Sequence, residues 1–285
     1  MALETRTAHA SDSVRIQLVR CRPHDHACGP LEYGRGDLLV LPLRGVFVRH
    51  LGPRERVVAD PCNALFFGHG EPYRVSHPAH AGDDCLVIEP AHNVLAEILE
   101  GRRIERSHTV LDARAIGERR MLAHRLDAGL ATHLESEETA LGLLARTLSA
   151  LGTPRTTSPR PGRRRARHEE MVEATKIALA ARPGEDWRLS ALAGRVASSP
   201  FRLARLFREI AGMPVHRYLV LARLSAALDE VLGSSRGITD IGVGLGFSSH
   251  SHFTAAFCRA FGVTPSGLRR GAPLTAQPGK ISTAA

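Results

Sequence analysis

From Val14 to about Pro90 the chain consists of short alternating or apolar runs separated by turns rich in Gly and Pro. The runs are VRIQLVR, DLLVLPL, GVFVRHL, NALFFGH, YRVSH and DCLVIE, and GPLEYGRGD, LGPRE and HGEP lie between them. Alternation with a period of two is typical of strands that bury one face. Strands at this close spacing predict a β-sandwich or a small barrel.

After His92 the apolar period lengthens to that of a helix. Apolar residues recur at spacings of three and four in HNVLAEILE, ARAIGERRMLAHRLDAGL and SEETALGLLARTLSALG. The last of these helices is expected to begin at Ser136, which two glutamates follow. We therefore predict that residues 1–151 form one domain in which helices follow the strands.

Residues 152–167, GTPRTTSPRPGRRRAR, contain three prolines, six arginines and no apolar residue larger than Ala. Such a segment cannot bury enough surface to offset the entropy lost on ordering, so we predict a flexible linker. Its arginines can be solvated or can contact phosphates transiently, and the sequence leaves both alternatives open.

After His168 the chain is predicted to be helical and contains a weak internal repeat, in which residues 189–214 align with residues 238–265. The aligned pairs are Leu192 with Ile241, Val196 with Leu245, Leu203 with Phe253, Phe207 with Phe257, and Gly212 with Gly262. Each copy combines a short apolar helix, a tight turn and a longer helix, which predicts a helix-turn-helix unit. A connecting helix is expected between the two units.

The longer helices of the two units carry different polar faces. In the first, Ser199 is the expected N-cap, and Arg202, Arg205 and Arg208 recur every three residues opposite the apolar stripe. Guanidinium groups so placed can bind phosphates or read guanine in the major groove. In the second helix, Ser248 or Ser249 is the expected cap. Its polar face is less charged and is expected to provide positioning contacts from Ser249, His250, Ser251, His252, Thr254 and Arg259.

Charge and composition indicate an anionic partner. The formal net charge is +9 and the pI is near 10.1. Lys and Arg number 18 against 20 acidic residues in residues 1–151, 6 against 0 in residues 152–167 and 13 against 9 in residues 168–270. The odd number of cysteines, five, and the lack of a signal segment predict a reduced, cytoplasmic protein. No apolar run approaches the roughly 20 residues needed to span a bilayer, so no membrane association is predicted.

Residues 168–270 resemble the DNA-binding domain of the AraC/XylS family of bacterial transcription regulators. The resemblance is carried by LSALAGRVASSPFRLARLFREIAG, the connecting helix and GFSSHSHFTAAFCRAFGVTPSGLRR. It implies two recognition helices that enter successive major grooves on one face of DNA. Many members have a basic residue where this chain has Ala255, the position aligned with Arg205. The first unit is therefore expected to supply more of the base readout.

The first half resembles the cupin-type sensor domain that accompanies this DNA-binding domain in many members, on the stretch from GVFVRHL to DDCLVIEP. The resemblance implies an α+β chain of two domains: an N-terminal cupin-like β-barrel with trailing helices, and a C-terminal all-α domain with two helix-turn-helix units on a connecting helix. Residues 271–285 are expected to form a disordered tail. The helices of residues 92–150 are expected to pair two subunits.

Together these features predict a sequence-specific transcription regulator and not an enzyme. Its expected partners are double-stranded promoter or operator DNA, an unknown small-molecule effector, a second copy of the chain and, as a further candidate, RNA polymerase. No cofactor is predicted. A general DNA-packaging protein is a weaker alternative, because the first half of the chain is nearly neutral.

The other alternative is a metal-dependent cupin enzyme with a helical accessory domain. If extended, HDHAC places two histidines and a cysteine on one side of a strand, which a second strand could approach. The candidate ligand-binding residues are His24, His26, His77 and Cys85. Metal cupins continue an HxH motif with a carboxylate and a later histidine, for which Glu32 and His77 are imperfectly spaced. No metal site is therefore predicted.

Overall fold

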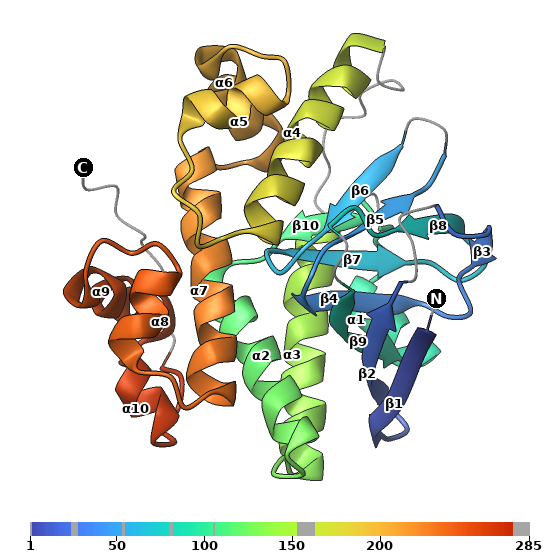
Figure 1. Cartoon of the computed structure of the whole chain (residues 1–285). Helices are drawn as coiled ribbons and strands as arrows, with labels where there is room; N and C mark the ends of the chain where they lie inside the picture. The colour runs from blue at the N-terminus through green and yellow to red at the C-terminus, as the bar shows by residue number, and fades with distance from the viewer. Residues whose placement is uncertain are drawn as a thin grey trace.

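The structure, a computed structural model, describes residues 2–23, 28–52, 55–79, 82–104, 106–152 and 163–275. It combines a sheet-rich N-terminal part with a helical C-terminal part, as predicted (Figure 1). Among the helices of the described ranges, none is long and apolar enough to cross a membrane.

The N-terminal strands form two antiparallel sheets. The strands are β1 (Ala2–Ala10), β2 (Val14–Arg22), β3 (Glu32–Tyr33), β4 (Leu38–Arg44), β5 (Phe47–His50), β6 (Arg56–Ala59), β7 (Asn63–Phe67), β8 (Pro72–Ser76), β9 (Asp83–Pro90) and β10 (His108–Val110). One sheet has the order β1-β2-β9-β4-β7-β10 and the other the order β3-β8-β5-β6. Phe47 and Val57 of the smaller sheet pack against Leu65, Phe67 and Val87 of the larger one, so an apolar core fills the space between the sheets.

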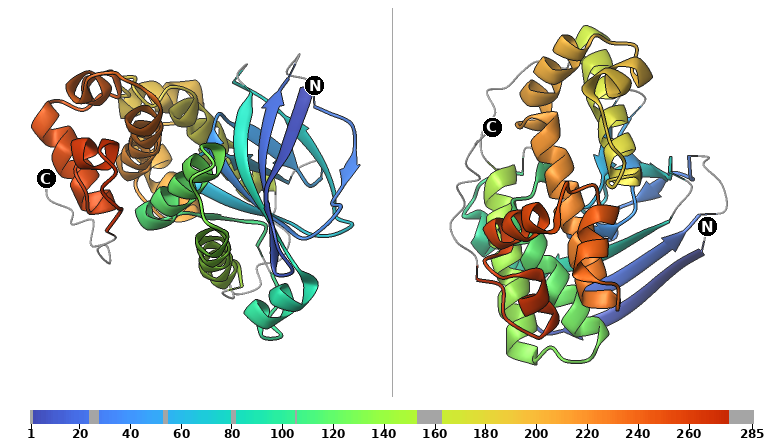
Figure 2. Two further views of the ribbon diagram at one scale, coloured as in Figure 1. Left: turned by 90° about the horizontal axis from the view of Figure 1, so that it is seen from below. Right: turned by 60° about the vertical axis from the view of Figure 1, so that its left-hand side comes forward.

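The helices follow in chain order. They are α1 (His92–Leu99), α2 (Ala113–Asp127), α3 (His133–Leu151), α4 (Arg163–Ala181), α5 (Leu189–Arg195), α6 (Pro200–Ala211), α7 (Val215–Gly233), α8 (Ile238–Gly244), α9 (His250–Phe261) and α10 (Pro265–Arg269). Helices α2 and α3 lie between the larger sheet and the C-terminal helices, and α7 runs along the centre of the C-terminal part (Figures 1 and 2).

The predicted start of α3 at Ser136 is wrong. The helix begins at His133, because the Thr132 hydroxyl caps it by accepting a hydrogen bond from the backbone N–H of Glu135 at 3.2 Å. Ser136 is buried one turn into the helix, and its hydroxyl donates to the Thr132 carbonyl at 2.7 Å.

Helix α4 begins at Arg163, five residues before the expected domain start at His168. Residues 153–162 of the predicted linker lie outside the described residues. Within α4, Arg165 pairs with Glu169 at 3.1 Å, one turn apart, which supports helical structure in the arginine-rich segment. At the other end of the chain, the Thr275 N–H donates to the Phe261 carbonyl at 3.2 Å, whereas residues 276–285 are not described.

The N-terminal and C-terminal parts pack directly against each other through a continuous apolar core. This core extends from the outer face of the larger sheet across α2 and α3 to α7 and both helix pairs. Polar side chains cross the same boundary. The buried Arg119 of α2 donates to the carbonyls of Pro42 and Pro61 and to Ser225 Oγ of α7. On α7, Asp229 binds Arg44 of β4 at 2.8 Å.

Candidate nucleic-acid interface

The first helix-turn-helix unit consists of α5 and α6. Ser199 caps α6 by accepting a hydrogen bond from the Arg202 N–H at 3.3 Å, and Pro200 occupies the first turn, where a missing N–H costs nothing. Gly212 ends the helix with a φ of 76°, a conformation that favours glycine. The sequence predicted the N-cap of this helix correctly.

The second unit, α8 and α9, repeats this design. Of the two candidate caps, Ser249 is the one that accepts from the N–H of His252, at 3.1 Å, and Gly262 ends α9 with a φ of 71°. The aligned apolar pairs of the repeat occupy equivalent buried positions: Leu192 and Ile241, Leu203 and Phe253, and Phe207 and Phe257. The sequence repeat is therefore a repeat of structure.

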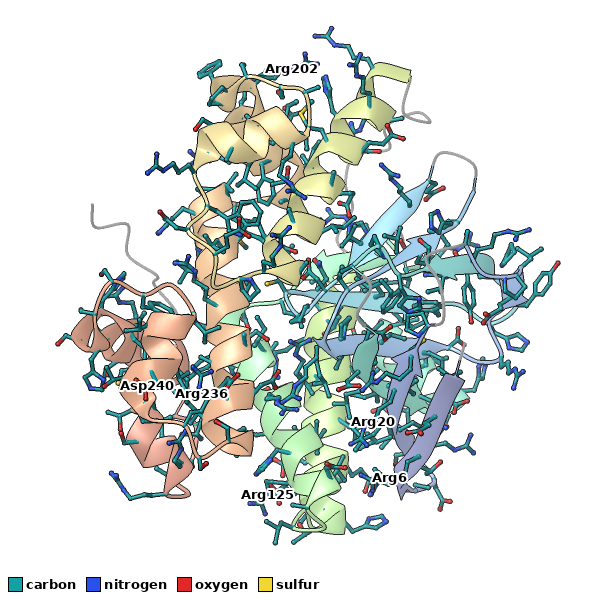
Figure 3. All side chains as sticks on the ribbon, in the orientation of Figure 1. Arg6, Arg20, Arg125, Arg202, Arg236 and Asp240 are labelled. Carbon is teal, nitrogen blue, oxygen red and sulfur yellow. The ribbon has the colours of Figure 1, made fainter. Side chains whose placement is uncertain are left out.

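The polar face of α6 carries three exposed arginines, Arg202, Arg205 and Arg208. None of the ion pairs found between described residues involves any of the three. Arg202, labelled at the top of Figure 3, donates instead to Nε2 of His168 at 2.9 Å. Burial and the neighbouring guanidinium lower the pKa of His168, so its neutral ring can accept this bond. The three positive charges remain available to an external anion.

The two histidines on the polar face of α9 contact α8, the turn between the helices and α9 itself. His250 lies 3.1 Å from Thr239 Oγ1 and 3.4 Å from Thr254 Oγ1, whereas His252 lies 2.9 Å from Ser248 Oγ. These contacts fix both imidazole rings. Of the predicted contact residues on this helix, Ser251 and Arg259 are exposed without such a contact among the described residues.

Arg223 of α7 joins the two units, a role that no sequence pattern indicated. Its Nε donates to the Pro183 carbonyl at 2.8 Å, its Nη1 to the Gly246 carbonyl at 2.8 Å and its Nη2 to the Glu185 carbonyl at 3.0 Å. A Cβ on Gly184 would lie 2.3 Å from the carbonyl oxygen of Gly244, so the backbones of the two units also meet closely. This junction fixes the spacing between α6 and α9.

Sequence reasoning also missed Phe201, whose side chain is 80% exposed in the first turn of α6. It lines an open groove together with Trp187, Leu189 and Arg205. A large aromatic side chain so exposed, beside the arginine face, can provide apolar contacts to a partner.

The predicted ligand-binding residues are partly brought together. His24 and His26 lie outside the described residues, but His77 and Cys85 both contact Asp83 between the two sheets. The His77 Nε2 lies 2.7 Å from Asp83 Oδ1, and the Cys85 thiol donates to Asp83 Oδ2 at 3.2 Å. Burial, and then the Asp83 charge, raise the pKa of the Cys85 thiol. Glu32 instead accepts a hydrogen bond from the Tyr73 hydroxyl at 3.0 Å.

Residues 192–271 match the family model of a helix-turn-helix domain. This segment is an AraC-type helix-turn-helix domain. The regulator ArgR of Pseudomonas aeruginosa is 30% identical over 114 residues, which cover 40% of this chain and 34% of ArgR. The activator RhaR of Yersinia pseudotuberculosis is 38% identical over 68 residues, covering 24% and 23% of the two chains. The chain thus spans well under half the length of the curated relatives it matches.

A crystal structure of ToxT from Vibrio cholerae with a bound unsaturated fatty acid aligns with 94% of this chain and 97% of ToxT, at 11% identity and a TM-score of 0.37.

Proposed function

We propose that this protein is a sequence-specific DNA-binding transcription regulator. The observation that carries the proposal is the face of α6, where Arg202, Arg205 and Arg208 are exposed and have no acidic partner in the described structure. Each can clamp a phosphate or bind guanine O6 and N7, and the exposed Phe201 can contact a thymine methyl group. The Arg223 junction supports simultaneous insertion of α6 and α9 in neighbouring grooves.

The N-terminal part is proposed to be a cupin-like sensor that binds a small-molecule effector. Effector binding can change the affinity for DNA only if the effector binds two conformations of the protein with different affinities. The contacts of Arg119 and Asp229 across the boundary with α7 are the elements that such a change would alter. Their burial supports a coupled rather than an independent motion of the two parts.

The protein is proposed to act in the cytoplasm as a homodimer that pairs through the helices following the sheets. Leu130 and Leu134, at the turn between α2 and α3, are 62% and 73% exposed, and a second copy of this surface would cover them. Sedimentation at micromolar concentration tests this part. A monomer throughout would refute it.

The function is tested by selecting bound fragments of sheared genomic DNA with the full chain at about 150 mM salt. Enrichment of a motif with half-sites about one helical turn apart is expected. Arg205→Ala should then weaken binding by about 1–3 kcal/mol and relax selectivity at one base pair. Arg35→Ala removes an exposed arginine of the N-terminal part and is the matched control.

Each result has a defined meaning. An equal loss of affinity on all sequences would make Arg205 a phosphate contact. Failure of the unaltered protein to distinguish any fragment from random DNA, with or without cell extract, would refute sequence-specific regulation.

A further inference from the structure

Four side chains with metal-binding chemistry meet inside the N-terminal part. Donor atoms of Cys21, His77 and Asp83 all lie within 4.8 Å of one another, and the three residues are buried. Cys85 is also buried, and its Sγ lies 3.2 Å from the second carboxylate oxygen of Asp83. Asp83 thus lies beside two sulfurs and one imidazole in a region from which solvent is excluded.

The register of the larger sheet creates this cluster. In the pairing of β2 with β9, Cys21 lies opposite Asp83 and Val19 lies opposite Cys85, so all four side chains point to one face of the sheet. That face is the inner one, because Cys85 packs in the core between the sheets. His77, which follows β8 of the smaller sheet, completes the cluster from the opposite side.

Gly82 makes the close approach of these segments possible. A Cβ at this position would lie 1.8 Å from the carbonyl oxygen of Cys21, so only glycine allows the chain entering β9 to pass so near β2. Arg22 holds the same corner, since its Nη1 donates to the carbonyls of Cys21 and Asp83. The donor groups of β2 and β9 are therefore held by paired strands and by the hydrogen bonds of Arg22.

We propose that Cys21, His77, Asp83 and Cys85 form a binding site for Zn²⁺. A tetrahedral set of thiolates, imidazole and carboxylate suits this borderline-soft ion, whereas Mg²⁺ and Ca²⁺ require sets of oxygen ligands. Closing on the ion requires Asp83 to exchange its contacts with His77 and Cys85 for a metal–oxygen bond. The donor atoms of Cys21, His77 and Asp83 already lie within 4.8 Å of one another, and rotation of the Cys85 side chain is needed to bring the second sulfur to the ion.

The proposal does not depend on DNA binding, and its test does not use DNA. The full chain, freed of any histidine tag and of bound metal, is titrated with Co²⁺ as a spectroscopic substitute for Zn²⁺. One equivalent of Co²⁺ should give the intense visible bands of a tetrahedral ion and a thiolate-to-cobalt charge-transfer band in the near ultraviolet. One equivalent of Zn²⁺ should abolish both.

Variants then assign the ligands. Cys21→Ser and Cys85→Ser should each reduce the charge-transfer band, and these variants and His77→Ala should each weaken Zn²⁺ binding by more than about 100-fold. Cys258→Ser, which removes the thiol of α9, is the matched control and should leave the spectrum unchanged. If a variant does not fold, X-ray absorption of the Zn²⁺-loaded unaltered protein counts its sulfur ligands directly.

Two sulfur ligands in that spectrum, with one equivalent of metal, would support the proposal. Absence of a charge-transfer band, or a coordination shell of nitrogen and oxygen alone, would overturn it. The cluster would then be an internal hydrogen-bond network in which Asp83 holds His77 and Cys85.

Discussion

The Tyr218 hydroxyl of α7 donates a 2.6 Å hydrogen bond to Oδ2 of Asp60, a residue between β6 and β7. Both side chains are fully buried, and burial raises the pKa of each. The same hydroxyl accepts from Nδ2 of Asn63 at 3.0 Å, and the second oxygen of Asp60 accepts from the N–H of Cys62 at 2.7 Å. The helix that connects the two helix-turn-helix units is therefore anchored in the N-terminal sheets by a buried polar network.

Removing this hydroxyl should weaken the whole molecule. Tyr218→Phe removes the donor to Oδ2 of Asp60 and one of the two acceptors of the Asn63 amide in a region closed to water, which should lower the free energy of unfolding by about 1–3 kcal/mol. Urea denaturation measures the change. Tyr33→Phe, on a tyrosine that is 60% exposed, is the control and should have no effect. Equal stability of the two variants would show that the network contributes nothing to docking.

Local signals in the sequence were sufficient for the ends of α6 and α9. Ser199, Gly212, Ser249 and Gly262 act within one helical turn of their own position, so their roles can be read from neighbouring residues. The interior strands were likewise predicted from short alternating or apolar runs. In contrast, β1, ALETRTAHA, has no apolar alternation, because it is an edge strand with mostly exposed side chains.

The contacts that the sequence did not reveal join distant segments. The approach of Cys21 to Asp83 depends on strand register, and that of Tyr218 to Asp60 on how α7 docks against the sheets. In the sequence, a buried arginine such as Arg119 cannot be distinguished from a surface arginine, because its hydrogen-bond acceptors lie on distant segments. Burial lowers its pKa to about 10. Patterns of neighbouring residues do not encode these relationships.

The turns of the two helix-turn-helix units each contain one residue in the left-handed conformation, and the residue types differ there. Ala197 has a φ of 49° where the second unit has Gly246 with a φ of 78°. Because the left-handed conformation costs a residue with a Cβ about 1 kcal/mol, Ala197→Gly should stabilise the protein by up to that amount. Gly246→Ala should do the opposite, since its Cβ would also lie 2.5 Å from Arg223. Thermal unfolding compares the stabilities of the two variants. A lower stability of Ala197→Gly than of the unaltered protein would show that the backbone at Ala197 is not strained.

His9 of β1 should make stability depend on pH. Its ring lies 4.3 Å from that of His133, and burial, followed by the charge of His133, lowers its pKa below the ordinary 6.5, although Glu137 opposes the shift. The folded state thus favours the neutral ring. This contribution is complete above about pH 6.5 and is lost as the pH falls through the lowered pKa.

The free energy of unfolding should therefore decrease between about pH 7 and pH 5, and His9→Gln should reduce the decrease. Urea denaturation at several pH values measures how the free energy of unfolding depends on pH in the unaltered protein and in the variant. His216→Gln, on an exposed histidine of α7, is the control. If the free energy of unfolding of His9→Gln decreases with falling pH as much as that of the unaltered protein, other groups cause the acid sensitivity.

Arg223 should matter to stability and to DNA recognition in different ways. Arg223→Ala removes hydrogen bonds from the carbonyls of Pro183, Glu185 and Gly246, and should destabilise the C-terminal part by about 1.5–3 kcal/mol. Arg223→Lys should recover little, because an ammonium group cannot reproduce the planar set of donors that reaches three acceptors. Arg217→Ala, at an exposed arginine of the same helix, is the stability control.

Loss of the Arg223 junction should also affect some DNA sites more than others. With the spacing between α6 and α9 loosened, affinity should decrease more for a site that both helices contact than for a half-site read by α6 alone. Titrations of both DNAs against folded Arg223→Ala, below its unfolding temperature, give this ratio. An equal decrease on the two DNAs would mean that Arg223 only stabilises the fold, and the spacing of the recognition helices would then have to be fixed by the contact of Gly184 with Gly244.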